Sequence, residues 1–107
     1  MTVSGQTLTR IQSLARLYQT GYRSNTVDAT IKKLISMERS RLQAELDELV
    51  GHLHGFEQQY HLSSEEFHHR FQAGEMGDDA DMFEWDAFYL MWLSAREQLD
   101  ALQAERI

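Results

Sequence analysis

The sequence contains no cysteine and no proline, and only six of its 107 residues are glycine. The lack of cysteine excludes disulfide bonds, thiol catalysis and thiolate metal sites. With no proline and few glycines, the chain shows no long linker and no low-complexity segment. No apolar run is long enough to cross a bilayer, and residues 1–10 lack the apolar core of a signal peptide. We therefore expect one cytoplasmic domain over residues 1–107, without membrane association and with residues 1–6 disordered.

The net charge of −7 conceals two halves of opposite sign. Residues 1–41 hold seven of the ten lysines and arginines but only two acidic residues, which gives +5. Residues 42–107 hold three basic and fifteen acidic residues, which gives −12. Two interpretations stay open. In the first, the two halves attract each other between subunits, or their charges simply keep different faces of the protein solvated. In the second, the charged halves bind partners of opposite charge.

A single long helix is predicted from about Asn25 to Tyr60, because apolar residues recur there at spacings near three and four. The residues of this seam are Ile35, Leu42, Leu46, Leu49, Leu53, Phe56 and Tyr60. Such a helix is roughly 54 Å long, whereas a compact chain of this length has a radius of gyration of about 13 Å. The helix therefore needs other helices alongside it, from its own chain or from a second copy. Gly51 and Gly55 raise the question of a bend or a close helix contact.

Three further helices are predicted around this one. A short amphipathic helix covers about residues 7–20 and ends at Gly21. Ser63 and Glu66 have the spacing of a capping box, which predicts a short helix from Ser64 that ends near Gly74.

The last helix is predicted to begin after a cap at Asp79 or Asp81 and to reach about Glu105. Its seam on heptad spacing consists of Trp85, Phe88, Trp92, Ala95, Leu99 and Leu102. We therefore expect an all-α fold in which the long central helix packs antiparallel against the C-terminal helix. The resulting hairpin or bundle would be completed by homodimerisation, with coiled-coil character along the seams.

The five histidines raise the possibility of a metal site. They are His52, His54, His61, His68 and His69. Two overlapping Glu-x-x-His spacings begin at Glu65 and Glu66, but a di-iron bundle needs a second such motif on a facing helix, which the sequence lacks. We expect solvated or partly packed histidines and no cofactor, with a metal-binding helical bundle as an alternative.

The acidic turn before the last helix is the best candidate for a partner-binding site. It contains Asp78, Asp79, Asp81 and Glu84, and the aromatic stripe around Trp85 follows it. Its spacing does not match a calcium-binding EF-hand loop. Helix capping accounts for the presence of one aspartate, and arginines of a partner could form ion pairs with the others.

The basic N-terminal half suggests an alternative function in DNA binding. Arg23, Lys32 and Lys33 are its candidate nucleic-acid contacts, and residues 21–24 resemble the turn between the helices of ribbon-helix-helix proteins. The match is partial, because residues 1–6 lack the alternating strand that reads the groove. The sequence shows no glycine-rich phosphate loop, no nucleophile elbow and no acid-base pair, so we expect no enzymatic activity.

A family resemblance combines several of these features. It rests on Gly21-Tyr22-Arg23-Ser24, the long charged helix, the run from Ser63 to Phe67, and the segment from Phe71 to Trp85. From about residue 8 onward, the chain resembles small all-helical bacterial and archaeal proteins that look like antitoxin partners of type II toxin-antitoxin modules. The resemblance implies a partner-binding role without fixing the target, and it supplies no catalytic residues. We expect a non-enzymatic protein-interaction module, the antitoxin-like partner that binds and neutralises a toxin.

Overall fold

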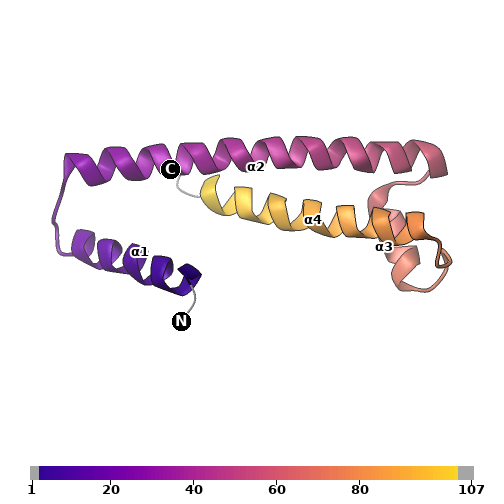
Figure 1. Cartoon of the computed structure of the whole chain (residues 1–107), viewed down its shortest axis with the longest axis horizontal. Helices are drawn as coiled ribbons and strands as arrows, with labels where there is room; N and C mark the ends of the chain where they lie inside the picture. The colour runs from indigo at the N-terminus through magenta and orange to yellow at the C-terminus, as the bar shows by residue number, and fades with distance from the viewer. Residues whose placement is uncertain (1–2, 104–107) are drawn as a thin grey trace. The chain divides into compact units, whose positions relative to one another are not determined.

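The computed structural model describes residues 3–103, which form four helices and no strand. The helices are α1 (Val3–Gln19), α2 (Asn25–Tyr60), α3 (Ser64–Gln72) and α4 (Ala80–Gln103) (Figure 1). The prediction of an all-α fold is therefore confirmed. The chain divides into two compact units, Met1–Leu34 and Ile35–Ile107, and α2 contributes to both.

The first unit contains α1, a tight turn and the start of α2. Gly21 adopts a φ of 98°, in the left-handed region that glycine tolerates, and it ends α1 as predicted. The hydroxyl of Tyr18 donates to Oδ1 of Asp28 at 2.6 Å and lies 3.0 Å from the carbonyl oxygen of Ser24. Oγ of Ser24 accepts from the backbone N–H of Val27 at 3.3 Å, which makes Ser24 the N-cap of α2. These bonds fix the turn between the two helices.

The beginning of α1 differs from the prediction. Residues 3–6 are helical, so α1 begins four residues before its predicted start at about residue 7. Residues 1–2 lie outside the described residues. No proline interrupts this segment, and the hydroxyl of Thr9 donates to the carbonyl of Gly5 at 3.0 Å within the first turns. Residues 3–6 are thus not the strand of a ribbon-helix-helix protein.

In α2, the predicted continuity is confirmed, because the helix runs without interruption through Gly51 and Gly55. A Cβ atom added at either glycine would meet no other atom within 4 Å. No close helix approach therefore requires a glycine at these two positions.

The second unit is built on the antiparallel packing of α4 against α2 (Figure 1). At one end of the pair, Nη2 of Arg39 donates to the carbonyl oxygen of Leu102 at 3.0 Å. At the other end, the hydroxyl of Tyr60 donates to Oδ2 of Asp81 at 2.8 Å. Residues 39–60 of α2 are thus paired with residues 81–102 of α4.

The core between these helices has two clusters. One cluster contains Leu42, Leu46, Leu49, Ala95 and Leu99, with Phe88, Trp92 and Leu102 packed against it. The other contains Leu53, Phe67, Met82, Trp85 and Tyr89, and adds α3 to the helix pair. The heptad seam predicted for α4 therefore faces the core.

Helix α3 begins at Ser64 as predicted, with Ser63 as its N-cap. Oγ of Ser63 accepts from the backbone N–H of Glu66 at 3.1 Å. The backbone N–H of Ser64 donates to Oε2 of Glu57 at 2.9 Å, so a carboxylate from α2 satisfies another free donor of the first turn. The side chain of Glu66 accepts from Nε of Arg70 at 3.0 Å. Helix α3 is thus capped partly by its own sequence and partly by α2.

Replacement of both Gly51 and Gly55 by alanine should stabilise the protein. Each position is helical and open, and alanine is about 1 kcal/mol more favourable than glycine in a helix interior. We expect the free energy of unfolding of the double variant to rise by about 1–2 kcal/mol, measured by urea denaturation. A decrease would mean that one of these glycines serves a contact outside the single chain.

Candidate partner-binding site

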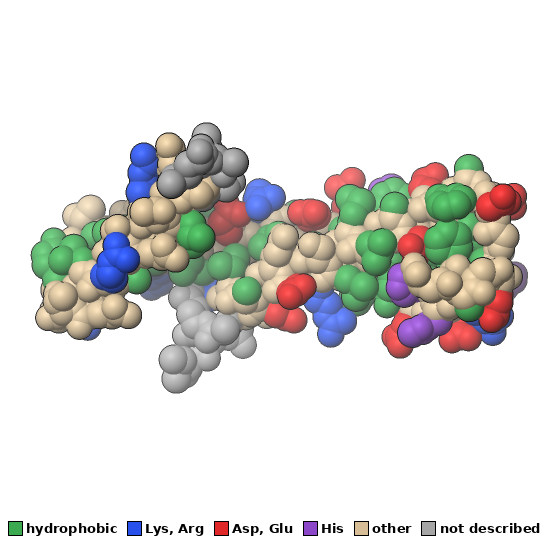
Figure 2. All heavy atoms as spheres, turned by 90° about the horizontal axis from the view of Figure 1, so that it is seen from below, with side chains coloured by type: hydrophobic (Ala, Val, Ile, Leu, Met, Phe, Trp, Pro, Cys, Tyr) green, Lys and Arg blue, Asp and Glu red, His purple; other side chains and the backbone are tan. Residues whose placement is uncertain are grey.

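The acidic turn lies between α3 and α4, at the end of the second unit, and continues into the first turns of α4, which carry Asp81 and Glu84. Gly74 and Gly77 adopt φ values of 76° and 77°, in the left-handed region that glycine tolerates. Asp78, Asp79 and Glu84 are exposed. Figure 2 shows acidic side chains distributed over this end of the second unit, with apolar side chains between them.

Asp81 has a structural role in addition to its place in the turn. It is half-buried and accepts the hydrogen bond from Tyr60. This bond, together with burial and the negative charges of Asp81 and Asp79, raises the pKa of the Tyr60 phenol above its ordinary value. Asp81 therefore ties the turn to the end of α2, while Asp78, Asp79 and Glu84 face solvent.

Trp85 does not lie where a partner could reach it. Its exposed fraction is 0%, and its indole stacks on Phe67 with a centroid distance of 3.9 Å and an interplanar angle of 5°. Its Nε1–H donates to Oγ of Ser64 at 2.9 Å. The structure thus corrects the prediction of Trp85 as a contact residue: in this conformation it is a core residue, because its position in the heptad seam turns it toward α2 and α3.

Phe83 is the aromatic residue that the acidic turn presents to solvent. Its exposed fraction is 57%, and its ring makes a T-shaped contact with that of Phe71, at a centroid distance of 5.3 Å and an interplanar angle of 88°. Asp79 and Glu84, both exposed, lie close to it in the sequence. The exposure of Phe83 could have been predicted from the sequence, because Phe83 lies outside the heptad seam that contains Trp85 and Phe88. The arrangement is an apolar anchor with a charged rim, as in many protein interfaces.

Asp86 points inward, unlike the other acidic residues near the turn. It is 6% exposed, and its Oδ1 lies 2.5 Å from Nδ1 of His68 on α3. The ring of His68 also lies 5.2 Å from that of Tyr89. The pair links α3 to α4 and was missed in the sequence, although Asp86 follows Met82 by four residues on the inner side of α4.

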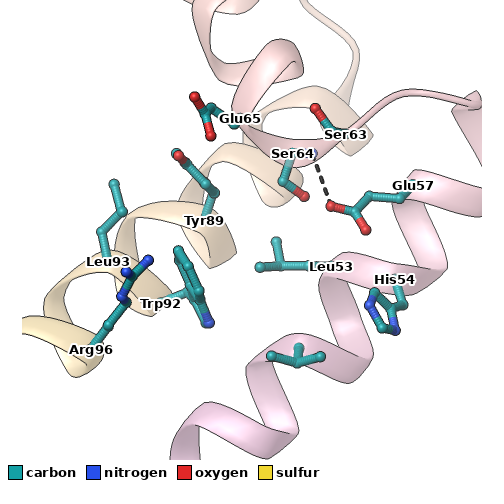
Figure 3. A pocket seen from close by; sticks show the side chains of 11 residues that line it. Leu53, His54, Glu57, Ser63, Ser64, Glu65, Tyr89, Trp92, Leu93 and Arg96 are labelled. Atoms are coloured by element: carbon teal, nitrogen blue, oxygen red, sulfur yellow. Dashed lines mark hydrogen bonds between the residues drawn. The ribbon is translucent and has the colours of Figure 1, made fainter. Parts of the chain in front are cut away.

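A pocket of about 410 Å³ lies between α2, the start of α3 and α4 (Figure 3). Its apolar part includes Leu53, Trp92 and Leu93, and its polar part includes Glu57 and Arg96. The guanidinium of Arg96 lies 5.2 Å from the ring centroid of Trp92. A pocket of this size with an apolar floor can accept a side chain of a partner. Sequence reasoning did not predict it, because its walls come from three separate helices.

The other histidines are distributed over several environments. The ring of His52 stacks on Phe88 at 4.3 Å, His54 borders the pocket, and His69 is exposed. His61 has a φ of 55° in the turn between α2 and α3. Within residues 3–103, no three His, Asp or Glu side chains come together in a way that could hold a metal ion.

The candidate nucleic-acid contacts lie in the first unit. Nη1 of Arg23 donates to the carbonyls of Tyr18 and Tyr22 at 3.2 and 2.7 Å, so this arginine supports the turn. Lys32 and Lys33 are exposed. As neighbours on a helix they diverge by about 100°, so they do not form one compact basic contact.

Among the helices of residues 3–103, none is long and apolar enough to cross a membrane. Comparisons with protein families, with curated proteins and with solved structures find no match to this chain.

Substitution of Trp85 and of Phe83 by alanine should distinguish a core residue from a surface residue. Trp85→Ala removes a fully buried ring and should lower the free energy of unfolding by about 3–5 kcal/mol. Phe83→Ala should lower it by less than about 1 kcal/mol, because more than half of that ring is already exposed. Urea denaturation of both variants measures the difference, and equal losses would contradict the assignment of Phe83 to the surface.

The hydrogen bond between Tyr60 and Asp81 predicts that the stability of the fold depends on pH. Since the folded pKa of Tyr60 is raised, the stability from this bond is fully present below about pH 10, the unfolded pKa. It is lost as the pH rises through the folded pKa, because a phenolate cannot donate. NMR titration of the tyrosine ring carbons should show a lower pKa for Tyr60 in Asp81→Ala and an unchanged one in Asp78→Ala. An unchanged pKa in Asp81→Ala would contradict the bond.

Proposed function

We propose that this chain is a non-enzymatic protein-interaction module that binds and neutralises the toxin of a type II toxin-antitoxin module through its acidic turn. The observation that carries the proposal is the exposed ring of Phe83, which contacts Phe71 and belongs to a segment in which Asp79 and Glu84 are also exposed. The resemblance described above points to the same class of function.

The chemistry of this site favours a basic partner. The second unit has a large excess of acidic residues, and such a field raises the association rate of a positively charged partner. A toxin that cleaves RNA or transfers nucleotides needs basic residues to hold its substrate phosphates. Carboxylates placed on those residues would compete with the substrate, while Phe83 supplies apolar contact that excludes water.

The turn is also suitably rigid for this role. Asp81 is bonded to Tyr60 on α2, and Phe71 on α3 supports the ring of Phe83. A contact surface that is fixed before binding loses little conformational entropy when the partner docks. The acidic residues that face solvent are therefore presented on a preorganised support.

The experiment starts with the product of the neighbouring gene. Its expression should arrest cell growth, co-expression of this chain should restore growth, and the two proteins should purify together. Growth without arrest, or failure to co-purify, would overturn the proposal.

Variants then locate the contact. Phe83→Ala should weaken the complex by about 30-fold or more, the effect of losing an interface hot spot. Asp78→Ala, Asp79→Ala and Glu84→Ala together should weaken it by about 10-fold and reduce its dependence on salt. The matched control replaces three exposed acidic residues elsewhere, Asp47, Glu48 and Glu66, by alanine. If both triple variants weaken the complex equally, the net charge of the chain determines binding and the acidic turn does not.

A further inference from the structure

The pocket between α2, the start of α3 and α4 has an apolar part and a polar part (Figure 3). Leu53 from α2 and Trp92 and Leu93 from α4 form the apolar part. Glu57 from α2 and Glu65 from the first turn of α3 belong to the polar part. The volume of about 410 Å³ is within the range of sites that hold small organic molecules, roughly 300–1,000 Å³. The pocket therefore suits a ligand with an apolar body and a polar head.

Tyr89 lines this pocket with a hydroxyl that has no partner in the described part of the chain. The residue is only 9% exposed, and its ring packs against those of His68 at 5.2 Å and Trp92 at 6.1 Å. Within residues 3–103, no group forms a hydrogen bond with the hydroxyl. Figure 3 shows the hydroxyl directed toward the side of the pocket where Glu65 lies. A largely buried polar group without a partner in its own chain requires one from outside, either water or a ligand.

The charges around the Tyr89 hydroxyl are mainly negative. After burial, the charge of Glu65 is the largest cause that raises the pKa of this phenol, and Asp86 adds to it. Arg96 lowers the pKa, but by less than Glu65 raises it. A negative field at the hydroxyl disfavours an anionic ligand and favours a cationic one.

The other polar groups of the pocket are also suited to a cation. Oε2 of Glu57 accepts from the backbone N–H of Ser64 at 2.9 Å, and its Oε1 has no partner among the described residues. The guanidinium of Arg96 lies over the Trp92 ring, 5.2 Å from its centroid, and His54 is exposed. The polar part of the pocket thus keeps a carboxylate oxygen available as an acceptor.

We infer that this pocket binds a primary ammonium group that is attached to an apolar body. An ammonium group has three N–H donors and no acceptor. The hydroxyl of Tyr89 and the carboxylates of Glu57 and Glu65 supply acceptors for it, while Leu53 and Trp92 contact the apolar body. A small alkyl amine and the lysine side chain of another protein share this chemistry. The inference does not depend on the proposed toxin, because it concerns residues outside the acidic turn.

The first test is an NMR titration of the full chain with phenethylammonium at about pH 8, at which an alkyl amine is protonated. The indole N–H signal of Trp92 should shift and saturate, with a dissociation constant of about 1 mM or lower. Phenylacetate, an anion of similar shape, and the neutral 2-phenylethanol should bind at least about 10-fold more weakly. No saturable shift with phenethylammonium, or equal binding of phenylacetate, overturns the inference.

Three variants test the roles of the side chains. Tyr89→Phe should raise the dissociation constant of phenethylammonium about 5-fold or more and leave stability to urea unchanged, because the hydroxyl bonds no described residue. Glu65→Gln should weaken binding, whereas Arg96→Gln should strengthen it by removing a positive charge.

The matched control is Glu66→Gln, which neutralises the neighbouring carboxylate, also exposed and in the same helical turn. Glu66 does not line the pocket, so the control should leave binding unchanged. Unchanged binding in Tyr89→Phe, or a control as weak as Glu65→Gln, overturns the inference. Changes of the opposite sign in Glu65→Gln and Arg96→Gln would assign an anionic ligand and overturn it too.

A second probe distinguishes the two sources of the ammonium group. Acetyl-lysine methylamide, with its free side-chain amine, presents that group as a protein does. Binding at least as tight as that of phenethylammonium assigns a lysine of a partner, whereas binding of phenethylammonium alone assigns a small amine. Absence of binding by both probes contradicts the inference.

Growth rescue separates this inference from the proposed function. Tyr89→Phe leaves Asp78, Asp79 and the ring of Phe83 in place. Rescue by this variant with weakened amine binding would confirm that the two sites are distinct. Amine binding by the wild type without any rescue of growth would overturn only the proposed function.

Discussion

The stacking of the Trp85 indole on Phe67 is the contact on which the second unit depends. It joins α4 to α3 with a ring separation of 3.9 Å, and Phe56 and Tyr60 add the end of α2 at 5.6 Å each. The polar edge of the indole is satisfied by Ser64, whose own N–H is bound by Glu57. Three helices thus meet at one buried ring with its hydrogen-bond donor paired, which avoids the cost of an unsatisfied buried polar group.

This arrangement determines what the acidic turn can present. With Trp85 directed into the core, Phe83, two residues earlier on the helix, is directed outward. The hydrogen bond from Tyr60 to Asp81 and the contact of Phe71 with Phe83 then hold the turn against the core. The proposed binding surface is therefore a consequence of the packing beneath it, and its residues gain their positions from α2 and α3 as much as from the turn.

The two units differ in how completely they bury their apolar residues. The second unit has two core clusters, whereas the described residues of the first unit contain no buried side chain. A chain whose apolar residues are only partly covered, and whose charges are separated along its length, is suited to association. The proposed toxin complex is in keeping with this property.

The sequence by itself determined the helices, because periodicity and capping are local. The 3.6-residue recurrence predicted α2 from Asn25 to Tyr60, and Ser63 with Glu66 predicted the start of α3 at Ser64. It also placed Asp78 and Asp79 in a turn before α4, since glycine and aspartate favour turns and caps. The start of α1 was misjudged, because residues 3–6 have no strong helix signal and become helical as an extension of the turns that follow.

Only the tertiary structure decided which of the aromatic and acidic residues are available. Trp85 and Phe83 are two residues apart in the sequence, yet one is fully buried and the other is mostly exposed, since α2 and α3 both pack over the first. Asp81 and Asp86 look like their acidic neighbours in the sequence, but Tyr60 and His68, distant in the chain, bind them. The pocket near Trp92 has walls from three helices and no local signature. Local patterns specify helices and their apolar sides, whereas exposure and pairing depend on which helices meet, and that is a property of the packed chain.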